Sequence, residues 1–548
     1  MKNQQKRIES SSLPWFEEGL GRVLRTGLVC AIMLLTCTGA FADDYIDQVN
    51  AFYADIRADQ RSDPIILAAL AEMDAPPEAV DTPSKAAMFP ASAGAWSAVQ
   101  EWAQMPQQVA VLDALGRVTE NAGTKQAMAF GQPYGIAALG SSPAQIKFIQ
   151  AGLYTDLGDP PMLAAAQHLY LARFDEIACL VNVEATRLLA DGDTEGALKV
   201  LINWLWFARQ IADREFFAEK MWAFDAMTDA ALRIRDVVYT DFHGSGNLTP
   251  DQIKEQIDRL LDHRGPIASD RIQLGRGDFI AVEQLIATVF GPDGMVQPEV
   301  FAPTMARLAS TSRPLRLFGE AARWNETAKR HANREGTLEA FNAMRDDYKF
   351  RWARDRYDPL LDQPYAVERY LNSPLVRNAV ATVTRSLPDM RKLFDARLIF
   401  RVELVGTRQA LALVGFYKEN HTYPLDITGV RPRFLVKLAA DPFNPNRSAG
   451  QRPPMQFYVP IRDTKDRFAP GEVAKPHEMT IITEGAENIL VRLGEDQFVL
   501  FSVGADGSPQ WADVVQNTIN APPGRDYLIW PPILSIVRET RMQSGSLN

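Results

Sequence analysis

Gly504, Asp506 and Gly507 place one carboxylate between two glycines at the end of an apolar run, QFVLFSVGADG, residues 497–507. Two structures would use this pattern. A hairpin turn favours Asp-Gly because both residues tolerate turn conformations. A loop folded around a cation needs a carboxylate oxygen, and glycines let main-chain carbonyls turn inward. The pattern by itself leaves both interpretations open.

A second candidate is the polar segment WNETAKRHANREGTLEAF, residues 324–341, which we expect to form one helix. His331 and Glu335 would then share a face at a spacing of four residues, with Glu326 and Glu339 close by. A metal or general-base site could use these side chains. A solvated face carrying i, i+4 charge pairs explains the same pattern and is favoured.

Short catalytic motifs are missing from the sequence. It contains no H-E-x-x-H, no G-x-S-x-G, no phosphate-binding loop ending in Gly-Lys-Ser/Thr and no G-x-G-x-x-G. The six histidines are far apart along the chain, so closely spaced metal-binding pairs are missing as well. We therefore do not favour an enzyme.

The N-terminus has the form of a secretory signal peptide. Two arginines precede an apolar run of 12 residues, 27–38, and the small-x-small sequence Ala-Phe-Ala follows at residues 40–42. Twelve residues are too few to cross a bilayer, which needs about 20. We expect cleavage after residue 42 and a mature chain without a membrane span, in the periplasm or at the cell surface. A retained anchor, or lipidation at residues 34–37, is the ranked alternative.

Charge and cysteine content narrow the class of protein. Removing residues 1–42 takes away five basic and three acidic residues, so the formal charge changes from −10 to −12. Nucleic acids and anionic membranes usually require a basic face, so neither is the expected partner. Cys179 remains as the one cysteine, which excludes an intramolecular disulfide. Its apolar, helical surroundings predict a buried, unreactive thiol.

Helical patterns dominate residues 43–395, which we predict to form a helical domain. In LTPDQIKEQIDRLLDH, residues 248–263, Thr249 and Gln252 form a capping box and Pro250 occupies the first helical position. Residues 184–213 contain two apolar-periodic segments around Asp-Gly-Asp, which predicts a helical hairpin. No repeat persists along the chain, so an irregular bundle is expected rather than a solenoid.

The pattern changes in residues 396–548, the second predicted domain. Residues 397–420 read as one long helix. Short β-type runs follow, separated by proline and glycine: FLVKL, MQFYV, MTIIT, NILVRL and QFVLFSV. Strands that follow helices in this way predict an α+β fold, with the long helix packed on a small antiparallel sheet.

Four segments of this second domain carry a family resemblance through their order along the chain. They are FYKENHTYP at residues 416–424, DPFNP at 441–445 followed by the aromatic strand QFY, FSVGADG at 501–507, and DYLIW at 526–530. In this order they resemble the globular domain of the major pseudopilin of type II secretion systems. The same module after a helical region is similar to large exported proteins of planctomycete-type bacteria, for which no activity is implied.

The resemblance implies a calcium site. In the pseudopilin family the loop after this strand binds Ca²⁺ through carboxylates and main-chain carbonyls. By position, Asp506 is the loop carboxylate, Asp526 matches the acid of Asp-x-x-x-Trp, and Asp513 is a third candidate. Two departures stand out: Ser508-Pro509 replaces the family's acid and glycine, and the stretch 506–526 is longer than the usual loop.

Filament assembly is not implied by the resemblance. A pseudopilin begins with an apolar membrane-spanning helix, whereas the matching helix here lies deep in the chain and carries several charges. We expect an exported, non-catalytic binding or assembly protein with an unidentified protein or cell-envelope partner. Its pseudopilin-like module would hold a structural Ca²⁺. The alternatives are a periplasmic hydrolase with a carboxylate-based site in the helical domain, and a membrane-tethered form of the same scaffold.

Overall fold

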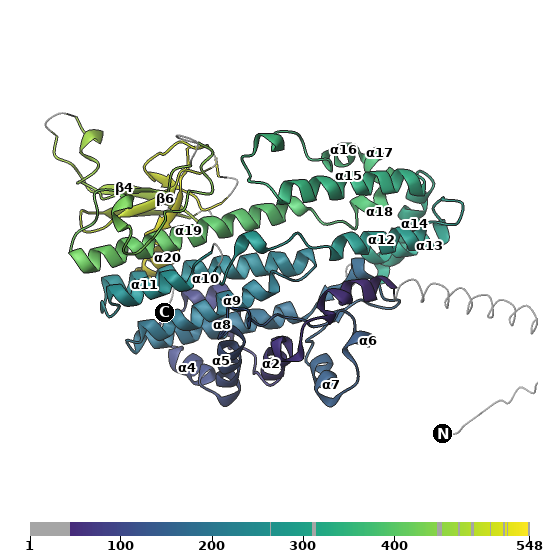
Figure 1. Cartoon of the computed structure of the whole chain (residues 1–548), viewed down its shortest axis with the longest axis horizontal. Coiled ribbons are helices and arrows are strands. Elements are labelled where there is room, and N and C mark those ends of the chain that lie inside the picture. The colour runs from purple at the N-terminus through teal and green to yellow at the C-terminus, as the bar shows by residue number, and fades with distance from the viewer. Residues whose placement is uncertain are drawn as a thin grey trace, which may run out of the picture.

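The computed structural model describes residues 44–262, 265–309, 314–446, 452–469, 472–483, 487–504, 506–518, 521–522 and 524–545. The predicted signal peptide lies outside this range. The described residues combine many helices with small, mainly antiparallel sheets, so the predicted α+β class is confirmed. The two sheets formed by β3 to β8 lie at one end of an elongated helical body, and α13, α14 and α18 lie at the other (Figure 1).

The first half of the chain is helical. Residues 44–54 form a helix. The elements that follow are η1 (Ala58–Gln60), α2 (Asp63–Leu70), η2 (Glu78–Val80), α3 (Pro83–Met88), α4 (Trp96–Ala103), α5 (Pro106–Thr119), α6 (Ile136–Leu139), α7 (Pro143–Gln150), β1 (Thr155–Asp156), η3 (Leu163–Ala165), β2 (Gln167–His168), α8 (Tyr170–Ala190), α9 (Thr194–Ile211), α10 (Phe217–His243) and α11 (Pro250–Arg259). Helices α8, α9 and α10 form its centre.

The second half begins with η4 (Ser269–Arg271), α12 (Gly277–Val289), α13 (Pro298–Ala309), α14 (Pro314–Ala328), α15 (Arg334–Trp352), η5 (Pro359–Leu361), α16 (Glu368–Leu371), α17 (Pro374–Ala379) and α18 (Ala381–Thr384). It continues with α19 (Met390–Asn420), η6 (Ile427–Val430), β3 (Gln456–Tyr458), η7 (Lys465–Arg467), β4 (His477–Ile482), β5 (Asn488–Leu493), β6 (Val499–Ser502), β7 (Val514–Val515), β8 (Tyr527–Trp530) and α20 (Ile533–Gln543).

Local sequence chemistry explains two of the helical predictions. The hairpin at residues 184–213 is confirmed as α8 and α9. Gly192 supplies the left-handed turn between them, and the Asp193 side chain caps α9 by accepting from the Gly196 N–H. The capping box of α11 is also confirmed, with both Thr249 and Gln252 bonded as expected.

The long helix α19 is central to the fold because it packs on both the helical body and a sheet. It begins at Met390 rather than at the predicted residue 397, since the Asp389 side chain caps it by accepting from the Arg391 N–H. The predicted domain border at residue 395 therefore falls inside this helix. One hydrophobic core runs from Ile66 to Trp530 across that border, and the division into domains stays a prediction.

Side chains of α19 join the helical body to the sheet directly. Glu403 forms an ion pair with Arg235 of α10 and accepts a hydrogen bond from the Tyr527 hydroxyl of β8 at 2.6 Å. Gly406 lets β8 approach closely, because a Cβ at this position would lie 2.5 Å from the Ile529 side chain. All three partner side chains are buried, so the contact is part of the core.

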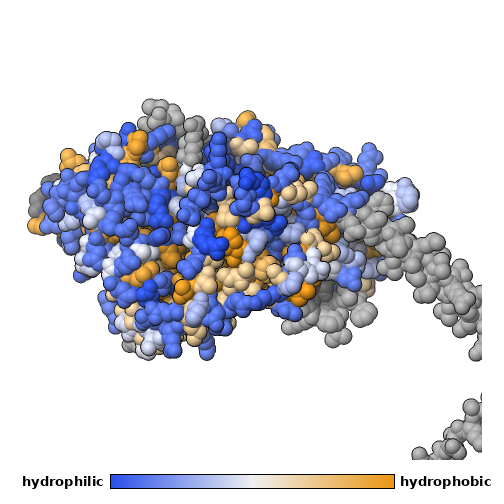
Figure 2. Space-filling view, turned by 60° about the horizontal axis from the view of Figure 1, so that its bottom comes forward, coloured by the Kyte–Doolittle hydropathy of each residue, from blue (hydrophilic) through white to orange (hydrophobic). Residues whose placement is uncertain are grey.

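The C-terminal strands form two small sheets rather than one. The first has the antiparallel order β3-β6-β8. The second has the order β5-β4-β7, in which β4 is antiparallel to β5 and parallel to β7. The outer surface is largely hydrophilic, with apolar side chains gathered near the middle of the face in Figure 2.

One predicted strand was wrong. FLVKL, residues 434–438, forms turns instead of a strand. The Phe434 and Leu435 N–H groups both bond back to the Val430 carbonyl at the end of η6. This places Phe434 and Leu435 in the core and leaves Val436 exposed, a pattern that does not alternate as a strand would.

Candidate functional site

Asp526 is a buried carboxylate with one unsatisfied oxygen. It directly precedes β8 and has no exposed surface. Its Oδ2 accepts from the main-chain N–H groups of Gln510 at 3.1 Å and Ala512 at 2.7 Å. Its Oδ1 has no hydrogen-bond partner among the described residues. Burial, together with the nearby charges of Asp506 and Asp513, raises the pKa of Asp526 to about 7 despite these two bonds.

Asp506 closes the loop by joining its two ends. One carboxylate oxygen accepts from the Ser508 N–H at 3.0 Å. The other accepts from the Gly524 N–H at 2.8 Å and from the Gln510 side chain at 3.1 Å. The carboxylate remains exposed, so its outer face is accessible to a cation from solvent.

The two glycines of GADG are required by the backbone. Gly504 and Gly507 have φ values of +68° and +69°, which L side chains rarely adopt. A Cβ at Gly504 would lie 2.9 Å from the Arg525 carbonyl oxygen, and one at Gly507 would lie 2.8 Å from the Pro445 ring. The segment is therefore a turn, and this explains the glycines whether or not the loop also holds a cation.

The backbone opposite Asp526 is strained. Trp511 and Ala512 are consecutive non-glycine residues with φ values of +61° and +55°. The Tyr458 hydroxyl holds this segment by donating to the Trp511 carbonyl at 2.7 Å. The arrangement directs the Ala512 N–H at Asp526, so the surrounding contacts impose the conformation and fix the carboxylate.

Asp513 already has a cationic partner. Nη2 of Arg467 donates to its two oxygens at 2.9 and 2.7 Å, and His477 Nδ1 lies 3.7 Å from Oδ1. The side chain is about half exposed, at 48%. Of the three predicted ligands, Asp513 is thus the one whose charge is already compensated by the protein.

The predicted calcium site stays a prediction. Within the described ranges, no three His, Cys, Asp or Glu side chains are arranged to hold a metal ion. Asp526 and Asp506 nevertheless suit a hard cation, because one has a free buried oxygen and the other an accessible carboxylate.

Two of the segments that carry the pseudopilin resemblance meet beside this loop. Asp441 is buried and accepts from the Ser502 hydroxyl at 2.7 Å and from the N–H groups of Phe443 and Val503. Asn446 donates to the Gly507 carbonyl at 2.5 Å. Burial raises the pKa of Asp441 to about 6, although its hydrogen bonds act against the rise. DPFNP and the asparagine that follows it are therefore hydrogen-bonded to the strand end and turn that carry GADG.

The second candidate, around His331, is not assembled as predicted. Residues 324–341 are not one helix: α14 ends at Ala328 and α15 begins at Arg334, where the Asn333 side chain caps it. Local capping overrides the apparent helical spacing. His331 lies in the intervening turn, buried against Phe290 and Phe301, and its Nε2 is bonded to Thr382.

The acids of that region do not converge on His331. Glu326 is exposed and pairs with Lys329. Glu335 and Glu339 line a shallow depression of about 590 Å³ that includes neither His331 nor Glu326. The solvated charged face, which the sequence favoured, is what the described residues form here.

A buried ionic cluster in the helical body was missed by sequence reasoning. Its centre is Glu219, which has no exposed surface. Glu219 accepts from Arg214 Nε at 2.8 Å, from the hydroxyls of Tyr134 (at 2.7 Å) and Tyr170, and from the Phe216 N–H at 3.2 Å. Both carboxylate oxygens are therefore satisfied.

The Arg214 guanidinium also forms cation–π contacts with aromatic rings. Its guanidinium carbon lies 4.2 Å from the ring centroids of both Tyr53 and Tyr134. Burial alone would raise the pKa of Glu219, but Arg214, His168 and the hydrogen bonds lower it to about 2. Tyr134 belongs to FGQPYG, residues 130–135, whose glycines and proline mark a loop but give no sign of a buried ionic cluster.

Cys179 is buried, as predicted, and burial raises the pKa of its thiol to about 12.

In the part of the chain that the structure describes, no helix is long and apolar enough to cross a membrane. No family model, curated protein or solved structure is significantly similar to the chain.

Proposed function

We propose that this chain is an exported, non-catalytic binding or assembly protein whose C-terminal module holds a structural Ca²⁺ at the GADG loop. The buried, unpartnered Oδ1 of Asp526 is the observation that carries the calcium part. A buried carboxylate oxygen without a partner costs free energy, and a hard cation offsets that cost with its own charge.

The scaffold part of the proposal is supported by buried ion pairs that tie the C-terminal elements to the helical body. Glu403 of α19 connects Arg235 of α10 with β8. Asp236 of α10 accepts from Arg538 Nη1 at 2.9 Å and from the Ser535 hydroxyl at 2.7 Å, which anchors α20. These contacts attach the module to the helical body, which supports its use as a binding platform.

The three candidate ligands differ in how readily they would coordinate Ca²⁺. Asp526 would supply Oδ1, and Asp506 would supply an oxygen from its exposed carboxylate. Asp513 would first have to leave Arg467. We therefore expect Asp526 and Asp506 to contribute more to calcium affinity than Asp513.

Thermal unfolding of the chain from Asp43 to Asn548 tests this proposal. With Ca²⁺ at 100 times its dissociation constant, the folded state gains about 2.7 kcal/mol, which raises Tm by several degrees. Asp506→Ala and Asp526→Asn should abolish the increase. Asp466→Ala removes an exposed carboxylate of the same region and should keep it. An unchanged Tm between Ca²⁺ and chelator in the unaltered chain would refute the calcium site.

Export is tested separately, by the mass of the mature N-terminus. Cleavage after residue 42 predicts a chain that begins at Asp43 and carries no lipid. A retained or lipidated N-terminus would instead identify the membrane-tethered form.

A further inference from the structure

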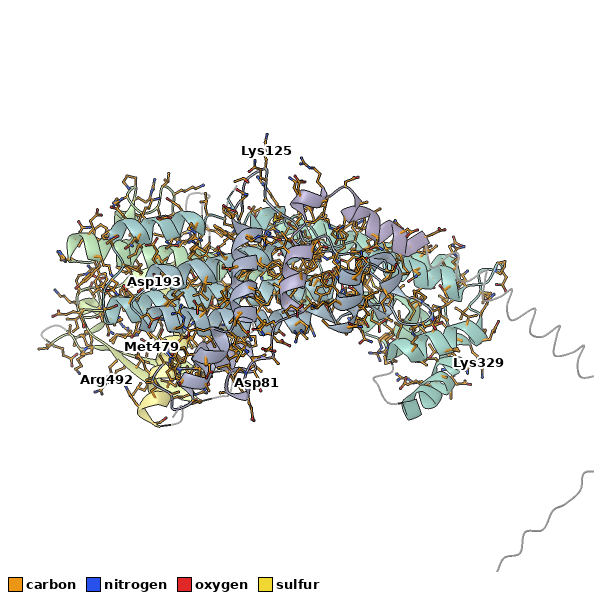
Figure 3. All side chains as sticks on the ribbon, turned by 90° about the horizontal axis from the view of Figure 1, so that it is seen from below. Asp81, Lys125, Asp193, Lys329, Met479 and Arg492 are labelled. Atoms are coloured by element: carbon orange, nitrogen blue, oxygen red, sulfur yellow. The ribbon has the colours of Figure 1, made fainter. Side chains whose placement is uncertain are left out.

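A cavity of about 480 Å³ lies where α3, α8, α9, α10 and α20 meet. Its volume is in the range of pockets that bind small molecules. In Figure 3 the segment that carries Asp81, just before α3, lies beside the yellow end of the chain that contains α20. Arg538 of α20 also donates to the Ala87 carbonyl of α3. The cavity therefore lies between elements from the two ends of the described chain.

The floor of the cavity is apolar and aromatic. Trp204 is buried, Trp222 is half-buried, and their rings pack edge to face with centroids 5.7 Å apart. Leu201 of α9 and Val537 of α20 are buried and complete the apolar walls. Such a floor suits the apolar body of a ligand, and an indole face also attracts cations.

Every charged side chain that lines the cavity is an acid. These are Asp175, Asp225 and Asp229, and no lysine, arginine or histidine is among the lining residues that the structure describes. Asp175 accepts from the Trp222 indole N–H at 2.8 Å through one oxygen. Carboxylates beside apolar walls create a negative potential that water screens only partly.

Asp225 has neither a hydrogen-bond nor an ion-pair partner within the described ranges. Asp225 is an exposed side chain among the residues that line the cavity, yet the surrounding protein raises its pKa to about 6 by desolvation alone. A carboxylate in this position gains free energy when a cation enters, because the cation replaces the hydration that the protein has removed.

Asn182 adds an independent sign of a ligand. Its exposed fraction is 8%, and its Nδ2 donates to the Ala178 carbonyl at 2.9 Å. That bond fixes the orientation of the amide and leaves Oδ1 buried without a partner. Asn182 lines the cavity, so a buried acceptor without a partner among the described residues lies in its wall.

We propose that this cavity binds a small organic cation, an ammonium group carried on an apolar body. The apolar floor with its two indoles accommodates the body, Asp225 and Asp175 attract the charge, and Asn182 Oδ1 accepts an ammonium N–H. The proposal goes beyond the structural calcium and does not depend on it, because the cavity and the GADG loop have no lining residue in common.

Isothermal titration of the chain from Asp43 to Asn548, with chelator present, tests the proposal. The probe is 2-phenylethylammonium, and 2-phenylethanol is its neutral analogue of the same size. We expect the ammonium to bind at least tenfold more tightly than the alcohol, because only the ammonium is attracted by the carboxylates. Tryptophan fluorescence should change on binding, since two indoles line the cavity.

Variants identify the site. Asp225→Asn keeps the shape of the side chain and should weaken ammonium binding about tenfold, whereas Asp225→Glu should keep most of the affinity. Asp47→Asn removes an exposed carboxylate that does not line the cavity and should change nothing. Circular dichroism confirms that each variant is folded. Equal binding of ammonium and alcohol, no binding of the ammonium, or an unaffected Asp225→Asn variant would each overturn the proposal.

Discussion

The helical body and the C-terminal loop each bury a carboxylate completely, but they surround it with different hydrogen-bond and ion-pair partners. Glu219 is bonded through both oxygens to an arginine, two tyrosines and a main-chain N–H, and its pKa falls to about 2. Asp526 is bonded through one oxygen to two main-chain N–H groups, and its pKa rises to about 7. Burial is the same in the two cases, so the partners make the difference.

Asp441 is an informative intermediate. It is as buried as the other two and accepts several hydrogen bonds, but it has no ion-pair partner among the described residues. Its pKa rises to about 6. Hydrogen bonds alone therefore do not offset the cost of burying the charge, whereas a cation does. This is the physical reason to expect that Asp526, rather than Glu219, binds an added cation.

The largest loss of stability should come from removing the Glu219 carboxylate, both of whose oxygens have partners. Glu219→Ala leaves the Arg214 charge buried without its carboxylate, and we expect the free energy of unfolding to fall by about 3–5 kcal/mol. Urea denaturation followed by circular dichroism measures it. Lys329→Ala breaks the exposed pair with Glu326 and should cause no measurable loss. Equal effects of the two substitutions would remove the basis of the comparison.

The raised pKa of Asp441 predicts how the stability of the protein changes with pH. Asp441 has a folded pKa of about 6 against an ordinary 3.8, so the folded state holds its proton more tightly. Its contribution to stability is fully present below about pH 4 and is lost as the pH rises through 6, by at most about 3 kcal/mol. Asp441→Asn should therefore gain stability relative to the unaltered chain between pH 4 and 7. A constant difference across this range in urea denaturation would contradict the prediction.

A smaller effect is expected where the sheet joins α19. Tyr527→Phe removes one hydrogen bond from Glu403 but leaves its pairing with Arg235. We expect a loss of about 1–2 kcal/mol, because one oxygen of a buried carboxylate then lacks a donor. Urea denaturation measures the loss. Tyr45→Phe, at a half-buried tyrosine far away in sequence, provides a control for loss of a hydroxyl. A larger loss in the control would show that the hydroxyl at Tyr527 has no special role.

The smallest expected effect is a gain in stability rather than a loss. In the presence of chelator, Asp526→Asn removes a buried charge that has no ion-pair partner among the described residues, and whose Oδ1 has no hydrogen-bond partner there either. We expect its Tm at pH 8 to lie slightly above that of the unaltered chain, whereas the same kind of neutralisation at Glu219 should lower Tm. A strong decrease for Asp526→Asn would mean that the carboxylate is already satisfied without an added ion.

Prediction from sequence succeeded where neighbouring residues decide the structure. The turn at Gly192 with its Asp193 cap, the capping box of α11 and the burial of Cys179 each depend on a few consecutive residues. Prediction failed where such local preferences compete. The Asn333 cap divides the expected helix around His331, and FLVKL turns so that Phe434 and Leu435 reach the core.

The candidate sites were predictable only in part. The GADG carboxylate was visible because glycines on either side mark a special backbone, and Gly504 and Gly507 do have positive φ. That Asp526 would keep one oxygen unpartnered was not visible, since this depends on Gln510 and Ala512 bonding only to the other oxygen. The acidic cavity gave no sequence pattern, because its walls come from five separate helices.

The sequence by itself determined the helix-rich first half, the shift to strands near the C-terminus and the turn at GADG, because each follows from the spacing of apolar residues and from local backbone preferences. Only the tertiary structure decided which buried charges have partners. Glu219 meets tyrosines some 50 and 85 residues away, and Glu403 meets Arg235 across 168 residues. Contacts over such separations depend on how the helices pack, and no local pattern encodes them.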